Sequence, residues 1–90
     1  MLNYNLKDVR DYFVKVHRLL KRWEINVRTH QKIRQLMEGV LDAVCKENGF
    51  KSRDEAAGKI PIGTKLEDKS LTGFNKLKEF IKAEELKHRN

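Results

Sequence analysis

Apolar residues recur at helical spacing in three long stretches of the chain. In residues 5–24 the apolar side chains fall within an arc of about 140° when each residue advances about 100° around a helix axis. Residues 29–48 show a similar arc, and residues 71–87 carry a third apolar stripe. The pattern predicts three main amphipathic helices, whose stripes are Leu6, Val9, Tyr12, Phe13, Val16, Leu19, Leu20 and Trp23; Ile33, Leu36, Met37, Val40, Leu41 and Val44; and Leu71, Phe74, Leu77, Phe80 and Ile81.

Residues at the expected helix ends support these boundaries. Asn5 precedes the first helix, and Asn26 or Thr29 precedes the second; such side chains accept a hydrogen bond from a free amide of the first turn. Gly49 can adopt the left-handed conformation that closes a helix, and Phe50 can supply the apolar contact that accompanies it. Because the first two helices are joined by only a few residues, we expect an antiparallel helical hairpin in the N-terminal half.

The stretch before the last helix has a weaker pattern. Ser52 opens a Ser-x-x-Glu capping box, which predicts one short helix over residues 53–58. Residues 58–69 contain glycines and a proline, and we expect them to be irregular or to form a small hairpin. Ile60 and Ile62 are expected to pack against the core.

Length and composition limit this architecture to one small domain. The chain has 90 residues, of which 39% are hydrophobic, so we expect residues 1–90 to form a single all-α domain around one core. A single cysteine excludes an internal disulfide. No apolar run reaches the roughly 20 residues of a membrane span, and acids interrupt the N-terminal stretch where a signal peptide is apolar. We therefore expect an intracellular protein, cytoplasmic or nucleoid-associated, with no membrane partner.

The candidate catalytic side chains show no local pattern of an enzyme site. Three histidines and two serines lack the spacing of a nucleophile–base pair. Cys45 lies at the edge of the second apolar stripe, where we expect a packed, unreactive thiol. No His, Cys and carboxylate group has the spacing of metal ligands. We expect neither catalysis nor a cofactor or metal; the side chains considered are His17, His30, His88, Ser52, Ser70 and Cys45.

Positive charge is concentrated in one stretch. Twenty Lys and Arg against thirteen Asp and Glu give a formal net charge of +7. Between residues 15 and 34, Glu24 is the only acid, and residues 25–37 contain no carboxylate, although the first turn of a helix usually attracts one. The seven cations of this stretch are Lys15, Arg18, Lys21, Arg22, Arg28, Lys32 and Arg34.

This charge placement predicts an anion site at the corner between the first two helices. The positive end of the second helix dipole and the side chains of Arg28, Lys32 and Arg34 would converge there, with cations of the first helix approaching from the other side. Nucleic-acid phosphates are the expected ligand. Trp23 lies in this region, but its angular position predicts packing in the core. The first hypothesis is therefore a nucleic-acid-binding accessory or regulatory protein, with DNA and RNA both open.

A second hypothesis is a protein-interaction module. Ala83 and Leu86 lie off the apolar stripe of the last helix and could form part of a contact surface. The partner would be an acidic protein surface or a second copy of the chain. Because positive charge attracts acidic proteins as well as phosphates, basicity alone does not separate the two hypotheses.

Residues 45–52 resemble the turn of the helix-turn-helix DNA-binding motif. A small residue, a three-residue spacer, a glycine, an apolar residue and a helix cap follow in the order of that motif. The next segment departs from it, because Glu55 stands at a position that is usually apolar and Gly58 interrupts the helix early. We therefore favour phosphate contacts by the cations over base contacts by a recognition helix.

Overall fold

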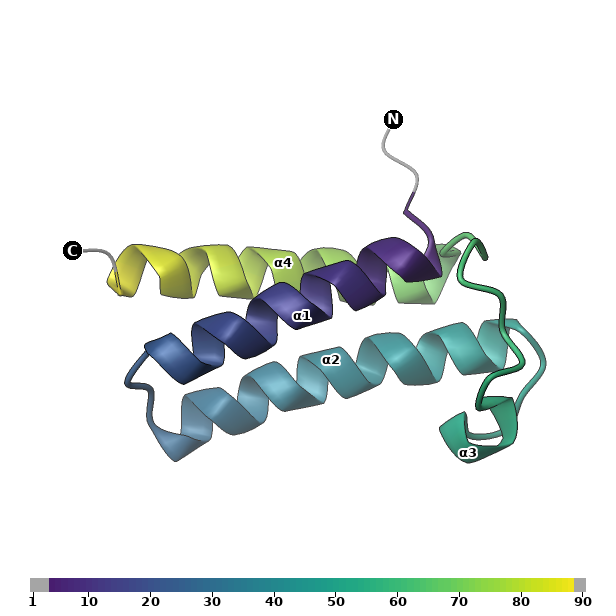
Figure 1. Ribbon diagram of the computed structural model, residues 1–90, viewed down its shortest axis with the longest axis horizontal. Helices are drawn as coiled ribbons and strands as arrows, with labels where there is room; N and C mark the ends of the chain where they lie inside the picture. The colour runs from purple at the N-terminus through teal and green to yellow at the C-terminus, as the bar shows by residue number, and fades with distance from the viewer. Residues whose placement is uncertain (1–3, 89–90) are drawn as a thin grey trace.

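The computed structural model describes residues 4–88, which form four α-helices. They are α1 (Leu6–Arg22), α2 (Val27–Glu47), α3 (Arg53–Ala56) and α4 (Asp68–Lys87). Figure 1 shows α1 and α4 running in the same direction and α2 running in the opposite direction. The predicted all-α fold, with three main helices, one short helix and an antiparallel hairpin of α1 and α2, is confirmed.

Side-chain caps set the starts of the first two helices. At α1 the Asn5 Oδ1 accepts a hydrogen bond from the Asp8 N–H (3.0 Å), and the Asp8 carboxylate accepts one from the Asn5 N–H (2.9 Å). At α2 the Asn26 Oδ1 accepts from the Thr29 N–H (2.8 Å). Asn26 is thus the cap, and α2 begins at Val27, two residues earlier than the apolar pattern predicts.

The end of α2 has the predicted glycine closure. Gly49 has a φ of +87°, in the left-handed region. Its N–H donates to the Lys46 carbonyl (3.2 Å), and the Phe50 N–H donates to the Cys45 carbonyl (2.9 Å). These two bonds satisfy carbonyls that the last turn of a helix leaves free.

The start of α4 differs from the prediction by three residues. The helix begins at Asp68, where the Ser70 hydroxyl accepts a hydrogen bond from the Glu67 N–H (3.0 Å). The carboxylate of Glu47, at the end of α2, accepts from the backbone N–H groups of Lys69 and Ser70, both at 3.0 Å. A cap supplied by another helix extends α4 beyond its apolar stripe.

The short helix α3 is two residues shorter than predicted. The Ser52 hydroxyl accepts from the Glu55 N–H (3.2 Å), as the capping box predicts. The helix ends at Ala56 instead of residue 58, because Ala57 leaves helical geometry with a ψ of 119°. Gly58 then takes a φ of +72°.

The irregular segment after α3 is held against the start of α1. The Leu6 N–H donates to the Thr64 carbonyl, and the Lys7 N–H donates to the Ile62 carbonyl, both at 2.8 Å. The segment forms no hairpin. Ile60 is half-buried, but the side chain of Ile62 is 49% exposed, so the expectation that Ile62 packs on the core is wrong. Its backbone carbonyl instead caps one free amide of α1, that of Lys7.

The core lies where the three long helices meet. α2 and α4 pack closely, because Gly73 places no side chain between α4 and Val40 of α2. α1 covers this pair through larger side chains, among them Tyr12 and Phe13. The predicted stripes supply the buried residues Val9, Val16, Ile33, Met37, Val40, Val44, Phe74, Leu77 and Ile81.

Candidate nucleic-acid interface and neighbouring hollows

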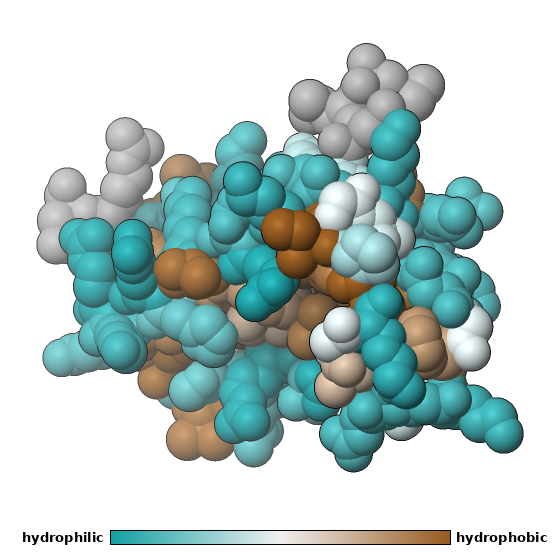
Figure 2. All heavy atoms as spheres, turned by 45° about the vertical axis from the view of Figure 1, so that its right-hand side comes forward, coloured by the Kyte–Doolittle hydropathy of each residue, from teal (hydrophilic) through white to brown (hydrophobic). Residues whose placement is uncertain are grey.

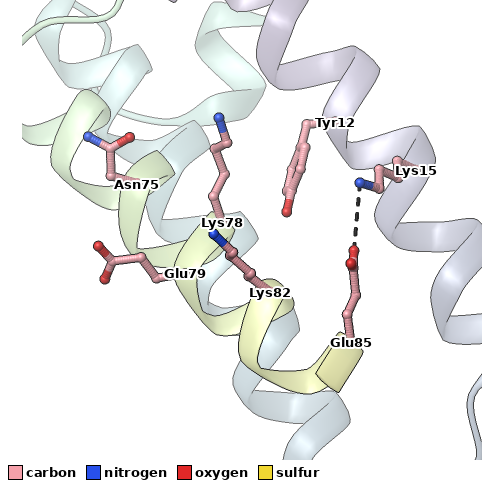
Figure 3. A pocket seen from close by; sticks show the side chains of 7 residues that line it. All are labelled: Tyr12, Lys15, Asn75, Lys78, Glu79, Lys82 and Glu85. Carbon is pink, nitrogen blue, oxygen red and sulfur yellow. Dashed lines mark ion pairs between the residues drawn. The ribbon is translucent and has the colours of Figure 1, made fainter. Parts of the chain in front are cut away.

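The seven predicted cations do not form one cluster. Lys15 lies on the side of α1 that faces α4, where its Nζ is 3.6 Å from the Glu85 carboxylate (Figure 3). An acid near the end of the chain, seventy positions along, therefore partners this cation. Both side chains of the pair are about half exposed, so the pair contributes little to stability.

Arg34 lies on a different face of α2 from the other predicted cations of that helix. At about 100° per residue, Arg34 is about 160° around the helix from Lys32. It lines a hollow between α1 and α2 together with Phe13 and His17. The predicted convergence of Arg28, Lys32 and Arg34 is therefore not formed.

The remaining five cations gather at one end of the bundle. We call this surface the basic end; it lies where α1 runs into α2 (Figure 1) and consists of Arg18, Lys21, Arg22, Arg28 and Lys32. All five are exposed. Within residues 4–88, no carboxylate lies within ion-pair distance of any of them. The positive charge of the basic end is thus open to solvent.

The basic end includes the first turn of α2, where cations are unfavourable. That turn contains no acid, and Arg28 is its second residue. A cation there opposes the helix dipole at a cost of about 0.3–1 kcal/mol when exposed. The last turn of α1 has the favourable arrangement, with Lys21 and Arg22 at the negative end of its dipole. Stability therefore accounts for only part of the basic end.

Trp23 closes the bundle beside the basic end. It is half-buried and packs against the core, as predicted. Its indole stacks on the His88 ring, with centroids 4.9 Å apart and planes 13° from parallel. The buried Glu84 carboxylate lies 3.0 Å from Lys87 Nζ and 3.7 Å from His88 Nε2. One face of the indole is thus occupied by the protein's own imidazole.

A hollow of about 500 Å³ between α1 and α4 is lined by charges of both signs, of which Lys15 and Glu85 form an ion pair (Figure 3). The Lys78 Nζ donates to the Tyr4 hydroxyl (2.6 Å) and lies 4.3 Å from the centre of that ring, a cation–π distance. Burial, and next the charge of Glu85, raise the pKa of Tyr12 to about 12, so this phenol stays protonated. The other lining residues are Lys15, Asn75, Glu79 and Lys82. This mixture of signs does not favour an anion.

The residues of the second hypothesis lie at the surface. Leu86 is 65% exposed, and Ala83 is exposed as well. Leu86 lines a hollow that also includes Arg22 and Trp23. An apolar side chain therefore adjoins the basic end.

The structure contains a groove between α1 and α2 that the sequence pattern did not predict. Its apolar lining includes Leu6, Phe13 and Leu41, which the helical stripes assign to the core but which are only half-buried. An arc as wide as about 140° includes residues at its edges, and the pattern alone does not tell an edge residue from a central one. Cys45 in the groove wall is buried, as predicted, and burial raises the pKa of its thiol; Asp42 raises it further, and Arg53 partly opposes both.

The helix-turn-helix resemblance stops at the turn. α3 contains only four residues, Arg53–Ala56, which is too short for a recognition helix lying in a DNA groove. Its Asp54 and Glu55 side chains are exposed and acidic. α3 therefore does not supply a recognition helix.

Within residues 4–88 the structure has neither a metal-binding cluster nor a helix that could span a membrane. No group of three or more His, Cys, Asp and Glu side chains is placed there to hold a metal ion. None of the helices in this range combines the length and the apolar character that crossing a bilayer requires. Comparison of the chain with protein-family models, with curated proteins and with solved structures finds no match.

Proposed function

We propose that the protein is a small nucleic-acid-binding accessory protein that contacts backbone phosphates through its basic end. The observation that carries this proposal is the exposure of five cations at one end of the bundle, with no carboxylate partner in the described chain. Guanidinium and ammonium groups in this state are available to displace counterions from phosphates. Binding of this kind depends on charge and tolerates changes of base sequence.

The placement of these cations supports binding over a purely solubilising role. A solubilising charge can stand anywhere on the surface, whereas Arg28 stands where the α2 dipole opposes it. At the other end of the molecule, acids alternate with the lysines, as in Asp54, Glu55 and Asp68. The basic end carries five cations with one acid, Glu24, in the same corner of the chain, so positive charge is denser there than at the opposite end.

Salt dependence tests the mechanism directly. If the five cations each neutralise one phosphate, log Kd for a short labelled DNA duplex changes with log salt with a slope of about 4.5. Affinity then falls about 500-fold between about 50 and about 200 mM salt. Fluorescence anisotropy at several salt concentrations measures the slope. A labelled RNA duplex and the single strands, measured in parallel, identify the preferred nucleic acid.

Two charge-matched variants locate the contact. The first replaces all five basic-end residues by Gln; the second replaces five exposed lysines at the opposite end, Lys46, Lys51, Lys59, Lys65 and Lys69. Each lowers the formal net charge from +7 to +2. We expect the first variant to lose about 100-fold in affinity at low salt and most of the slope, and the second to keep both. Equal losses in the two variants would show that net charge alone attracts the nucleic acid, and the proposal would be wrong.

A second candidate function, docking on an acidic protein, is favoured by a different feature. The α1–α2 groove combines apolar walls with arginines from three helices. That feature does not involve the basic end.

A further inference from the structure

A continuous groove runs between α1 and α2. Its wider part has a volume of about 540 Å³ and is closed by α3. A narrower part of about 190 Å³ continues along the same two helices and shares Phe13, Leu41 and Arg53 with the wider one. Figure 2 shows hydrophobic side chains reaching the surface between hydrophilic ones on this side of the molecule.

The floor of the groove is apolar and incompletely covered. Leu6, Phe13, Leu41 and Ile60 line it and are only half-buried, although Val44 beneath them is 3% exposed. On the other side of α2, Gly73 of α4 lies against Val40, so that α2 and α4 are in close contact there. Covering the half-buried residues with another apolar surface would remove them from water, which is favourable.

The rim of the groove is positively charged along its length. Arg10 comes from α1, Arg34 from α2 and Arg53 from the start of α3. The residues that line the groove include one acid, Glu38. Asp42 lies outside the groove, 3.6 Å from the Nε of Arg53, and leaves the other guanidinium donors of that residue available.

We propose that this groove binds an acidic amphipathic helix of a partner protein. From Leu6 to His17 the groove follows α1 over twelve residues, a length of about 16 Å at a rise of about 1.5 Å per residue, which accommodates three turns of a helix. Apolar residues at i, i+4 and i+7 of the partner would contact the floor. Its carboxylates would meet Arg10, Arg34 and Arg53 on the rim.

The distribution of charge favours this occupant over two others. A fatty acid presents one carboxylate, whereas the arginines stand on three elements along the groove. A second copy of the chain also carries +7, so the two copies repel each other. None of the basic-end residues lines the groove, so the inference does not rest on the proposed nucleic-acid contact.

Two labelled peptides of about 18 residues, or five helical turns, test the charge preference. Both place Leu at helical spacing; one carries Glu and the other Lys at the remaining positions. We expect the Glu peptide to bind measurably in fluorescence anisotropy, and the Lys peptide to bind at least about tenfold more weakly. The Glu peptide should also slow alkylation of Cys45, the only cysteine, by a small thiol reagent. That thiol is buried in the groove wall, so it reacts slowly and only when the groove opens, and an occupied groove opens less often.

Matched substitutions identify the groove as the binding surface. Ala57 is exposed and lines the groove, so Ala57→Glu and Ala57→Lys add side chains of similar length and opposite charge. We expect Ala57→Glu to weaken the Glu peptide about fivefold or more and Ala57→Lys to leave it unchanged or tighter. Replacing Arg10, Arg34 and Arg53 together by Gln should weaken it at least about tenfold, whereas the matched change at Lys65, Lys69 and Lys76 should not.

Three results would overturn the inference. Equal binding of the two peptides would remove the charge preference. Protection of Cys45 by oleate but not by the Glu peptide would assign the groove to a lipid. If Cys45 becomes better protected as the protein concentration rises, with no peptide or oleate added, the groove is occupied by a second copy of the chain. None of these measurements uses a nucleic acid, so failure here is separate from failure of the oligonucleotide experiment.

Discussion

At the scale of single residues, Glu47 connects two helices that the sequence pattern treats separately. Its carboxylate accepts hydrogen bonds from the Lys69 and Ser70 backbone and, at 2.6 Å, from the Ser70 hydroxyl. Partial burial alone raises the pKa of Glu47, but the hydrogen bonds from the start of α4 outweigh it and hold the pKa below its usual value. The charged carboxylate therefore stabilises the fold.

Glu47→Gln should lower the free energy of unfolding by about 1–2 kcal/mol at neutral pH, because neutral hydrogen bonds replace charge-assisted ones. The pKa of Glu47 is lower in the folded than in the unfolded protein. The stability that the carboxylate adds is therefore complete above the unfolded-state pKa, and it is lost as the pH falls through the folded-state pKa. The difference between wild type and variant should therefore shrink in acid. Urea titrations at a series of pH values measure it.

Glu38→Gln is the matched control for this experiment. Glu38 is exposed on the same helix, and we expect its replacement to change stability by less than about 0.5 kcal/mol. A Glu47→Gln deficit that stays constant down to strongly acidic pH would contradict the assigned role of the carboxylate.

At the scale of helices, α2 contains one glycine that a larger residue could replace and is followed by one that it needs. Gly39 lies within α2, is exposed, and has no atom within 4 Å of the position of an added Cβ. Gly49 follows the helix with a φ of +87°, a conformation that side chains with a Cβ rarely adopt. One glycine weakens the helix, and the other ends it.

The same substitution at these two positions should have opposite effects. Gly39→Ala should stabilise the protein by about 0.5–1 kcal/mol, because alanine loses less conformational freedom in a helix. Gly49→Ala should destabilise it by about 1 kcal/mol, because the left-handed conformation strains the added side chain. Urea midpoints at constant m value compare the two. Stabilisation by both substitutions would show that α2 does not end in the glycine closure.

At the scale of the whole molecule, charge is unevenly distributed along the longest dimension of 42 Å. The basic end has exposed cations with no carboxylate partner among residues 4–88. The opposite end mixes the signs, with Glu47, Asp54 and Glu67 among the lysines. Mutual repulsion is therefore concentrated at the surface that we propose for phosphates.

Salt should raise the thermal midpoint of the wild-type protein, by about 3–5 °C between low and moderate concentration, because it screens this repulsion. The five-Gln variant of the basic end should lose most of this rise. The five-Gln variant of the opposite end, with the same net charge of +2, should keep more of it. Calorimetry measures the midpoints, and identical salt responses in the two variants would contradict the uneven distribution.

Local interactions explain why so much of the fold was predictable. Apolar spacing identified the three long helices, and nearly all the fully buried side chains belong to the predicted stripes. Three helix ends were predicted correctly from single residues, namely Asn5, Ser52 and Gly49. Each of these residues caps a helix through hydrogen bonds with amides or carbonyls only a few positions away. The candidate cations were also evident from the sequence, since a charge run is visible without a fold.

Only the tertiary structure decided which of these groups meet. The start of α4 depends on Glu47, more than twenty positions away, and Lys15 is paired with Glu85 across the bundle. Helical rotation separated Arg34 from the basic end and placed it in the groove. That groove exists because α1 packs at a greater distance than α4 does, which depends on side-chain shape across helices. The sequence by itself determines the helices and their polar and apolar faces; packing alone determines which faces remain uncovered.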